Sequence, residues 1–235
     1  MLFSRFAQSL NSVTVLQKKG MCNSLPNEVN VLVNNSTIIY PTHMLAVTNT
    51  QQPANRRKVN LYPVHSLVLA AQCAKMPPFP PTPVVSTDQQ TPQIIKLPVL
   101  FITIPHPDSF SALLVYLYCK DPIKLAKDLM PLPPPTTLLE DPSHVVQYAT
   151  KLAMTFTDVA LLRFASLVHG LWQNVCAFSI DNETLWTTID TLWEVFISAL
   201  TMSTGQRQPV LAPSLSRKQA DPSSPSSVPT IQSDP

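Results

Sequence analysis

The chain has 235 residues and a formal net charge of +2, with 16 basic and 14 acidic side chains. A charge this close to balance argues against a strong attraction to nucleic acid or to acidic membranes. Hydrophobic residues make up 45% of the sequence and charged residues only 13%, so the chain can bury a sizeable core behind a surface poor in charge. We expect one α+β domain, residues 29–200, between two disordered segments.

The first segment, residues 1–28, carries three basic residues and no acid before Glu28. We expect a disordered extension; a mitochondrial transit peptide is the alternative, although such peptides are richer in arginine. Residues 203–235 contain eight serines and six prolines with almost no bulky apolar side chain. Such a composition cannot offset its ordering entropy, so we expect residues 201–235 to form a disordered tail.

Short strands and loops are predicted at the start of the domain. Val29–Val33 and Ser36–Tyr40 are rich in β-branched residues and are expected to pair as a hairpin. Residues 43–57 are expected to form a polar loop, and Lys58–Tyr62 a short strand. The basic run at the end of the loop is interpreted as a solvated edge, with a localisation signal as the alternative; it consists of Arg56, Arg57 and Lys58.

Residues 63–73 are predicted to form the central buried helix. Pro63 suits a first helical turn, where its missing N–H has no partner in any case. At helical spacing, one face holds Val64, Leu67, Val68 and Ala71, and most of the remainder is covered by Leu69, Ala70 and Cys73. A helix that is apolar almost all round is buried. We expect the ring of His65 to donate to a nearby carbonyl and to fix the local geometry.

A proline-rich loop and a covered strand follow. The prolines of residues 76–95 favour polyproline II, and we interpret the segment as a stiff exposed loop, with a ligand for an aromatic groove as the alternative. Lys96–Ile104 contains a run that is apolar at successive positions. Because both faces of such a strand are hydrophobic, we expect a central position in the sheet.

The second half is predicted to be helical. Proline, cap and periodicity signals predict helices at Ser109–Tyr118, 122–130, 142–155, 158–178 and 181–200. The expected caps are Asp108 or Ser109, Asp121, Asp141 and Asp181. On the last helix the apolar face holds Leu185, Ile189, Leu192, Trp193 and Phe196, and the opposite, purely acidic face holds Glu183, Asp190 and Glu194.

We interpret the acidic face as solvated, with a basic partner as the alternative. The tryptophans, Trp172, Trp186 and Trp193, are spaced for helix packing and not for stacking on single-stranded nucleic acid.

Chemical motifs are scarce. Cys22, Cys73, Cys119 and Cys176 form no CxxC pair, and we expect free thiols, buried at the helical positions. No HExxH, GxSxG or Cys/His cluster occurs, and 3 glycines supply no phosphate loop. We therefore expect no cofactor, no metal and no catalysis. An enzyme that uses dispersed residues such as His65, Cys119 and Asp121 is the competing hypothesis.

The run His65-Ser66-Leu67-Val68-Leu69-Ala70-Ala71 resembles the His-x-x-Val-Leu-Ala-Ala run that opens the central helix of BTB/POZ domains. The helix that contains Phe110, Tyr116 and Tyr118 is similar to that family's Phe…Leu-Leu…Tyr helix. The family's last helical pair is similar to Ala149–Met154 and Leu161-Leu162. The resemblance covers residues 29–170. We call the following eight the signature residues: His65, Val68, Leu69, Ala70, Ala71, Phe110, Tyr116 and Tyr118.

The chain departs from that family in its long proline-rich loop, in Lys120 where a glycine is usual, and in having no kelch repeat or zinc finger after the domain. Its layout is similar to the clampless proteins of basidiomycete fungi. This resemblance implies a non-enzymatic adaptor that binds protein partners such as transcriptional regulators. It also implies a regulatory role in mating and sexual development, through clamp-cell formation and dikaryon maintenance. Formation of a homodimer is left open.

A DNA-binding regulator is a third hypothesis, against which the small net charge and the lack of a basic helix argue. No apolar run reaches the ~18 residues that span a bilayer, so we expect no membrane contact and an intracellular location, cytoplasmic or nuclear. A pocket with converging polar groups favours an enzyme, whereas an exposed apolar groove favours an adaptor.

Overall fold

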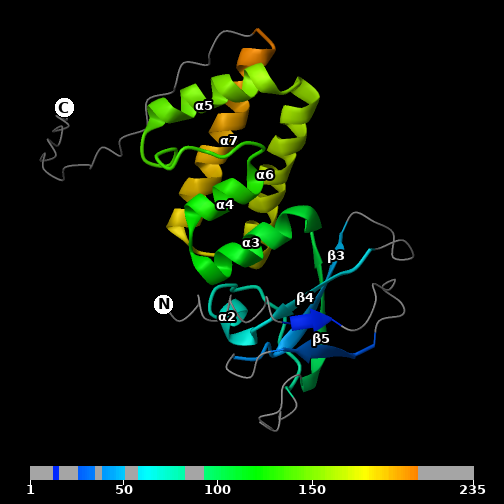
Figure 1. Ribbon diagram of the computed structural model, residues 1–235. Helices are drawn as coiled ribbons and strands as arrows, with labels where there is room; N and C mark the ends of the chain where they lie inside the picture. The colour runs from blue at the N-terminus through cyan, green and yellow to red at the C-terminus, as the bar shows by residue number, and fades with distance from the viewer. Residues whose placement is uncertain (1–12, 16–25, 35–38, 51–57, 83–92, 206–235) are drawn as a thin grey trace, which may run out of the picture.

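The computed structural model of the chain describes residues 13–15, 26–34, 39–50, 58–82 and 93–205. Within these residues a mixed sheet forms one end of the molecule and a group of helices the other, with helix α3 (Pro107–Cys119) between them (Figure 1). The α+β class that the sequence predicts is confirmed.

The sheet has five strands in the order β1-β2-β5-β3-β4. Their bounds are Val13–Val15 for β1, Glu28–Val33 for β2, His43–Asn49 for β3, Asn60–Val64 for β4 and Gln93–Ile104 for β5. The first half of β5 pairs antiparallel with β2, and its second half pairs parallel with β3. The long strand β5 therefore joins two halves of the sheet, and the central position predicted for residues 96–104 is confirmed.

Two predictions for the first half of the domain are wrong. Residues 43–49 do not form a polar loop, because Met44–Val47 supplies an apolar run that β3 buries on both faces of the sheet. The predicted hairpin does not form either: β2 pairs with β1 and β5, and residues 39–40 belong to no strand. A period-2 pattern identifies a strand but not its partner. Residues 36–38 and 51–57 lie outside the described part of the chain.

The prediction of a disordered extension over residues 1–28 is wrong for Val13–Val15 and Glu28. Val13–Val15 forms strand β1, which pairs with β2, and Glu28 begins β2. Residues 1–12 and 16–25 lie outside the described part of the chain.

The helix predicted at residues 63–73 is wrong at its start. Pro63 lies in β4, opposite Met44, and helix α2 spans only Ser66–Ala70 before a turn leads to Cys73. Because β4 lies at the edge of the sheet, Pro63 can extend the strand where its missing N–H costs no ladder bond. Residues 62–64 pair with β3 as part of strand β4, so the helix starts after them.

The helices of the second half agree closely with the prediction. Besides α3, they are α4 (Pro122–Leu129), α5 (Pro142–Thr155), α6 (Asp158–Phe178) and α7 (Glu183–Ser203). As predicted, Asp121 caps α4 by accepting from the Lys124 N–H at 3.0 Å, and Asp141 caps α5 by accepting from the Ser143 N–H at 2.8 Å.

Two predicted caps are wrong. His106 precedes α3 without a side-chain cap bond, because Pro107 at the first helical position starts the helix before Asp108 and Ser109. Asn182 caps α7 in place of Asp181; its side-chain oxygen accepts from the Leu185 N–H at 2.8 Å and also from the Tyr116 hydroxyl at 2.9 Å. A tertiary contact therefore selects the cap.

Helix α7 continues past residue 200, and residues 206–235 of the predicted tail lie outside the described chain.

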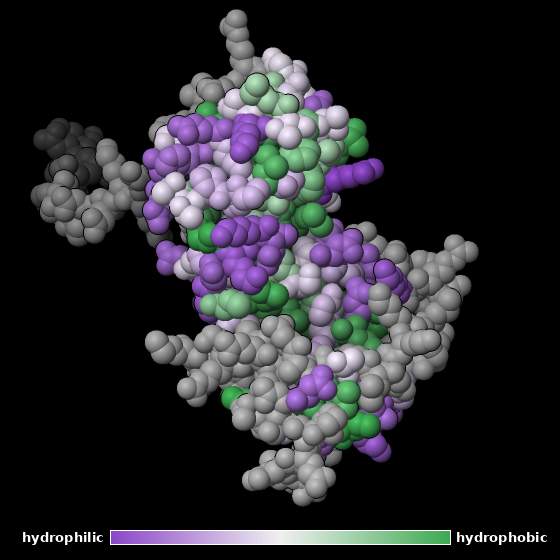
Figure 2. Space-filling model, viewed as in Figure 1, coloured by the Kyte–Doolittle hydropathy of each residue, from purple (hydrophilic) through white to green (hydrophobic). Residues whose placement is uncertain are grey.

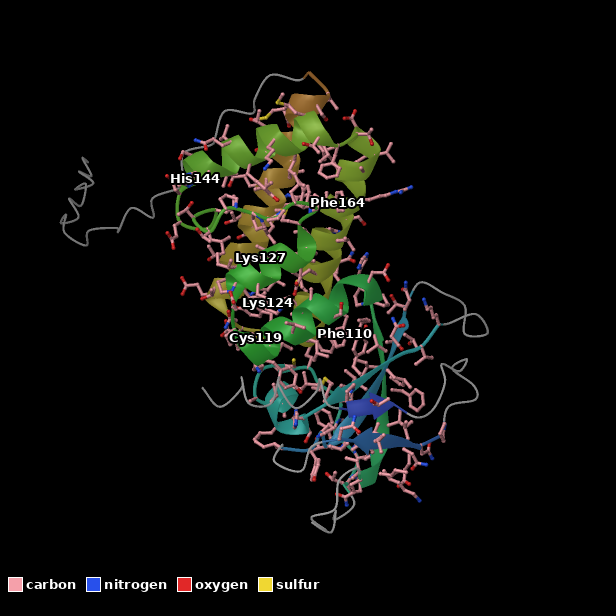
Figure 3. The ribbon with its side chains drawn as sticks, viewed as in Figure 1. Phe110, Cys119, Lys124, Lys127, His144 and Phe164 are labelled. Atoms are coloured by element: carbon pink, nitrogen blue, oxygen red, sulfur yellow. The ribbon has the colours of Figure 1, made fainter. Side chains whose placement is uncertain are left out.

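The main hydrophobic core extends from one face of the sheet through α3 into the helices. Phe110 on α3 lies next to the sheet, where its ring centroid is 5.3 Å from that of Tyr62 and 5.9 Å from that of Phe178 (Figure 3). Phe164 on α6 contacts Phe156 and Phe196 within the helical group. A second cluster, on the other face of the sheet, draws its buried residues from β2, β3, β5 and Val59. The main core thus connects the sheet with the helices, and the second cluster belongs to the sheet end of the molecule alone.

The first described part of the proline-rich loop, residues 76–82, packs against the sheet. Met76 and Phe79 pack against the main core, and the His43 ring lies 4.9 Å from that of Phe79. The Nε2 atom of His43 is 2.8 Å from the Pro80 carbonyl oxygen. The stiff loop that the sequence predicts is therefore exposed only in part. Residues 83–92 lie outside the described chain, and residues 93–95, expected in the loop, belong to β5, where they pair with β2.

Candidate functional site

The signature residue His65 lies at the junction of β4 and α2 and is only 1% exposed. Its backbone N–H donates to the Tyr118 hydroxyl at 2.9 Å, and its Nδ1 lies 3.1 Å from the same hydroxyl. Its Nε2 lies 3.1 Å from the carbonyl oxygen of Ile39. Three parts of the chain meet at this one side chain: the segment that leads into β3, the β4–α2 junction and α3.

The hydrogen bonds fix the tautomer of His65. A carbonyl oxygen can only accept, so Nε2 carries the proton and donates to Ile39, while the unprotonated Nδ1 accepts from the Tyr118 hydroxyl. Burial lowers the pKa of the imidazole, opposed by the bond to Ile39. Burial also raises the pKa of Tyr118 to about 12, opposed by the N–H of His65. Both groups are neutral near pH 7, and this geometry agrees with the structural role expected for His65.

Most of the other signature residues share the main core. Val68, Leu69, Phe110, Tyr116 and Tyr118 are all buried in it. Ala70 and Ala71 are exposed, and Leu67, placed by the sequence on a buried face, is 65% exposed. Helix α2 is therefore buried on one side only, where Val68 and Leu69 face the main core.

The residues of the enzyme hypothesis have separate roles. Cys119 is exposed at the end of α3, Asp121 caps α4, and His65 is bonded to Tyr118. Cys73 is buried as predicted, and burial raises the pKa of its thiol to about 11, opposed by Lys120, which makes it a poor nucleophile near neutral pH. The prediction of buried thiols is wrong for Cys119 and for the exposed Cys176, and Cys22 lies outside the described residues.

Lys120 has a backbone conformation that suits glycine better than lysine. It ends α3 in the left-handed conformation, with φ 55°, which glycine adopts most readily. Its Nζ lies 5.4 Å from the centroid of the Tyr116 ring, a cation–π distance. Burial lowers the pKa of this ammonium, opposed by Cys73.

An exposed aromatic groove lies between α6 and α7. It has a volume of about 200 Å³ and is lined by Val168, His169, Trp172, Ile189, Asp190 and Trp193. The His169 ring is stacked on that of Trp172, with centroids 5.7 Å apart, and lies 6.2 Å from that of Trp193. The two indoles are 43% and 41% exposed. Large aromatic surface left in solvent on neighbouring helices marks a candidate interaction site.

The groove does not follow from the sequence prediction, in which all three tryptophans pack between helices. That assignment holds for Trp186, which packs on the core and whose indole N–H donates to the Ile180 carbonyl. The sequence does contain a signal for the others. Trp193 lies one residue before the acidic Glu194 and three after Asp190, so it belongs to the boundary between the two faces of α7 and not to the centre of the apolar face.

A second hollow, of about 410 Å³, lies between the Pro133–Pro135 loop and α5, where His144, Tyr148 and Lys151 contribute polar groups. Tyr148 and His144 contact neighbouring groups of the chain. The Tyr148 hydroxyl donates to the Leu132 carbonyl, and burial raises its pKa to about 12, opposed by that bond. The His144 Nδ1 lies 3.7 Å from the Asp141 carboxylate. No arrangement of a nucleophile beside a base follows from these contacts.

The surface over α4 is hydrophilic. Figure 2 shows polar residues gathered there, and Lys124 and Lys127, labelled on α4 in Figure 3, are both exposed. Lys124 pairs with Asp128 at 3.8 Å.

Among the residues that the structure describes, no three His, Cys, Asp or Glu side chains are grouped to hold a metal ion. In that same part of the chain, none of the helices combines the length and hydrophobicity needed to span a bilayer.

The fold defines a mixed α+β protein in which a five-stranded sheet is joined to a helical group through α3. Family models identify it further: the Clampless protein 1 N-terminal domain matches residues 2–105, and the Clampless protein 1 C-terminal domain matches residues 123–230. The chain belongs to the clampless protein family, which is consistent with a role in clamp formation. The boundary between the two matches falls at α3. No curated protein and no solved structure matches the chain.

Proposed function

We propose that this protein is a non-enzymatic regulator of clamp formation in fungal sexual development, and that it acts by binding protein partners through its folded part. The observation that carries this proposal is the groove with two half-exposed indoles on adjacent helices. Tryptophan is enriched among the residues that dominate binding energy at protein interfaces. Family membership supports the developmental role.

The test uses the whole chain expressed in clamp-forming hyphae that lack their own copy. Affinity capture identifies the partners, and microscopy counts the clamp cells. We expect a chain that lacks residues 206–235 to keep both its partners and clamp formation. Capture of every partner by the fragment 206–235 alone would show that the tail carries the function. Substrate turnover, or a metal bound at stoichiometric occupancy in purified protein, would contradict the non-enzymatic part.

The BTB/POZ resemblance of residues 65–71 belongs to the same proposal. The order β4, His65, α2, β5 and α3, with the ring of Tyr118 on α3 packed against that of His65, supports it. BTB/POZ domains self-associate, so we propose a homodimer. Sedimentation of the purified chain at micromolar concentration tests this, and a monomer at all concentrations would contradict it.

A further inference from the structure

We infer that the groove between α6 and α7 binds an arginine side chain of a protein partner. This inference rests on the proposed function in one respect, that the chain binds proteins at all. It goes further by naming the chemistry of the group that enters the groove, and three features of the lining support it: size, aromatic faces and charge.

The size favours a single side chain. Pockets for small-molecule ligands usually enclose ~300–1,000 Å³, whereas this groove encloses about 200 Å³. Val168 and Ile189 are buried and form an apolar base, and Trp172 and Trp193 remain exposed at the sides. A long side chain can lay its aliphatic stem on such a base while its polar end stays at the edge.

The aromatic rings favour a cation. The face of an indole carries negative potential and attracts ammonium or guanidinium groups within ~6 Å. The stacking of His169 on Trp172, with ring planes 15° apart, holds one indole in place. Guanidinium is preferred over ammonium because its plane can lie flat on an aromatic ring and its N–H groups can still pair with a carboxylate. Asp190, exposed in the same groove, supplies that carboxylate.

The charges around the groove also favour a cationic side chain. Residues 158–203, which form α6, α7 and their connection, contain five acids, Asp158, Asp181, Glu183, Asp190 and Glu194, against one arginine, Arg163. Helix α7 has no lysine or arginine, and His169 is the one basic residue among those that line the groove. The chain as a whole has a net charge of +2, so this negative region is local. A basic group is therefore drawn to the groove, and an acidic one is repelled.

The test titrates the full-length chain with an octa-arginine peptide and follows tryptophan fluorescence. Octa-citrulline is the neutral control, because citrulline keeps the shape of arginine without its charge. Three variants separate the contributions: Trp193→Leu removes the aromatic face, Asp190→Asn removes the carboxylate, and Glu183→Gln removes an acid of the same helix outside the groove. Circular dichroism checks that each variant is folded.

We expect octa-arginine to bind, Trp193→Leu and Asp190→Asn to weaken it by about tenfold and about threefold respectively, and Glu183→Gln to leave it within twofold. Equal binding of octa-citrulline, or an equal loss in Glu183→Gln and Asp190→Asn, would overturn the inference. Binding that appears only after removal of residues 206–235 would make the chain's own tail the occupant. If the chain forms a dimer and Trp193→Leu abolishes it, the occupant of the groove is a second copy of the chain. Either result rejects a partner's arginine.

Failure here is distinguishable from failure of the proposed function. If Trp193→Leu captures the same partners from hyphae as the parent chain, the groove is not the site and the proposed function remains. If the parent chain itself captures no partner, the proposed function fails whatever the peptide does.

Discussion

The hydroxyl of Tyr118 makes two hydrogen bonds to His65, accepting from its backbone N–H and donating to its Nδ1, across 53 positions of the sequence. The rings lie edge to face, with centroids 5.8 Å apart. Both residues are 1% exposed, so water cannot replace either bond. This pair connects the sheet-to-helix junction with α3, the helix that joins the two ends of the molecule.

Tyr118→Phe is expected to lower the free energy of unfolding by about 1–3 kcal/mol, because it leaves the buried N–H of His65 without its acceptor. Urea unfolding followed by circular dichroism measures the loss. Tyr116→Phe on the same helix is the matched control. It removes a donor to Asn182, whose oxygen still accepts from Leu185, so its cost should be smaller. A greater cost for Tyr116→Phe would contradict the importance of the His65 pair.

His65 should make stability depend on pH. Its pKa is lowered in the folded chain by burial, whereas in the unfolded chain it is about 6.5. Below that pH the unfolded state binds a proton that the folded state does not, so the free energy of unfolding falls as pH falls, by up to ~1.4 kcal/mol per pH unit. The stability is fully present above the unfolded pKa and declines from there toward the folded one.

Urea titrations at pH 7.5, 6.5 and 5.5 compare the parent chain with His65→Gln. We expect the variant to be less stable at pH 7.5 but to lose less stability on acidification. His169→Gln, at an exposed position, should follow the parent. Parallel curves for the parent and His65→Gln would show that His65 does not titrate differently in the two states.

Leu69 tests whether the short helix α2 still anchors the domain. It is 2% exposed and belongs to the main core, so Leu69→Asp places an unpaired carboxylate in apolar surroundings. This costs several kcal/mol against a total stability of ~5–15 kcal/mol, and the variant should be unfolded at room temperature. Leu67→Asp, on the exposed side of the same turn, should fold normally. A melting temperature for Leu69→Asp within two degrees of the parent would rule out the anchor role.

The sequence predicted the second half of the fold better than the first for a physical reason. In α4 to α7 the signals are local: α4 and α5 each begin with a capping aspartate and a proline, and apolar periodicity predicts α6 and α7 without reference to the rest of the chain. In the first half, β2 pairs with β5, whose residues lie sixty to seventy positions further along the chain. Pro63 lies in a strand because β4 pairs with β3, a contact that the residues around Pro63 do not reveal. The groove was missed because exposure of Trp172 and Trp193 depends on how α6 and α7 pack together.

The end of α6 offers a stabilising substitution. Ser179 has φ 50° and ψ 56°, a left-handed conformation that costs a residue with a Cβ atom about 1–2 kcal/mol. The Ile180 N–H donates to the Val175 carbonyl at 3.1 Å, and the Ser179 N–H donates to the Cys176 carbonyl at 3.1 Å. This is the Schellman arrangement, in which glycine is the usual residue at the position of Ser179.

We therefore expect Ser179→Gly to raise the free energy of unfolding by about 1 kcal/mol, and the melting temperature by about 2–4 °C for a chain of this size. Lys120→Gly relieves the same kind of strain but also removes the cation from the Tyr116 ring, so its gain should be smaller. Ser166→Gly, within α6, is the control and should lower stability by about 0.5–1 kcal/mol, since glycine disfavours a helix interior. Calorimetry of the three variants compares them, and a loss of stability in Ser179→Gly would show that its side chain contributes more than the backbone strain costs.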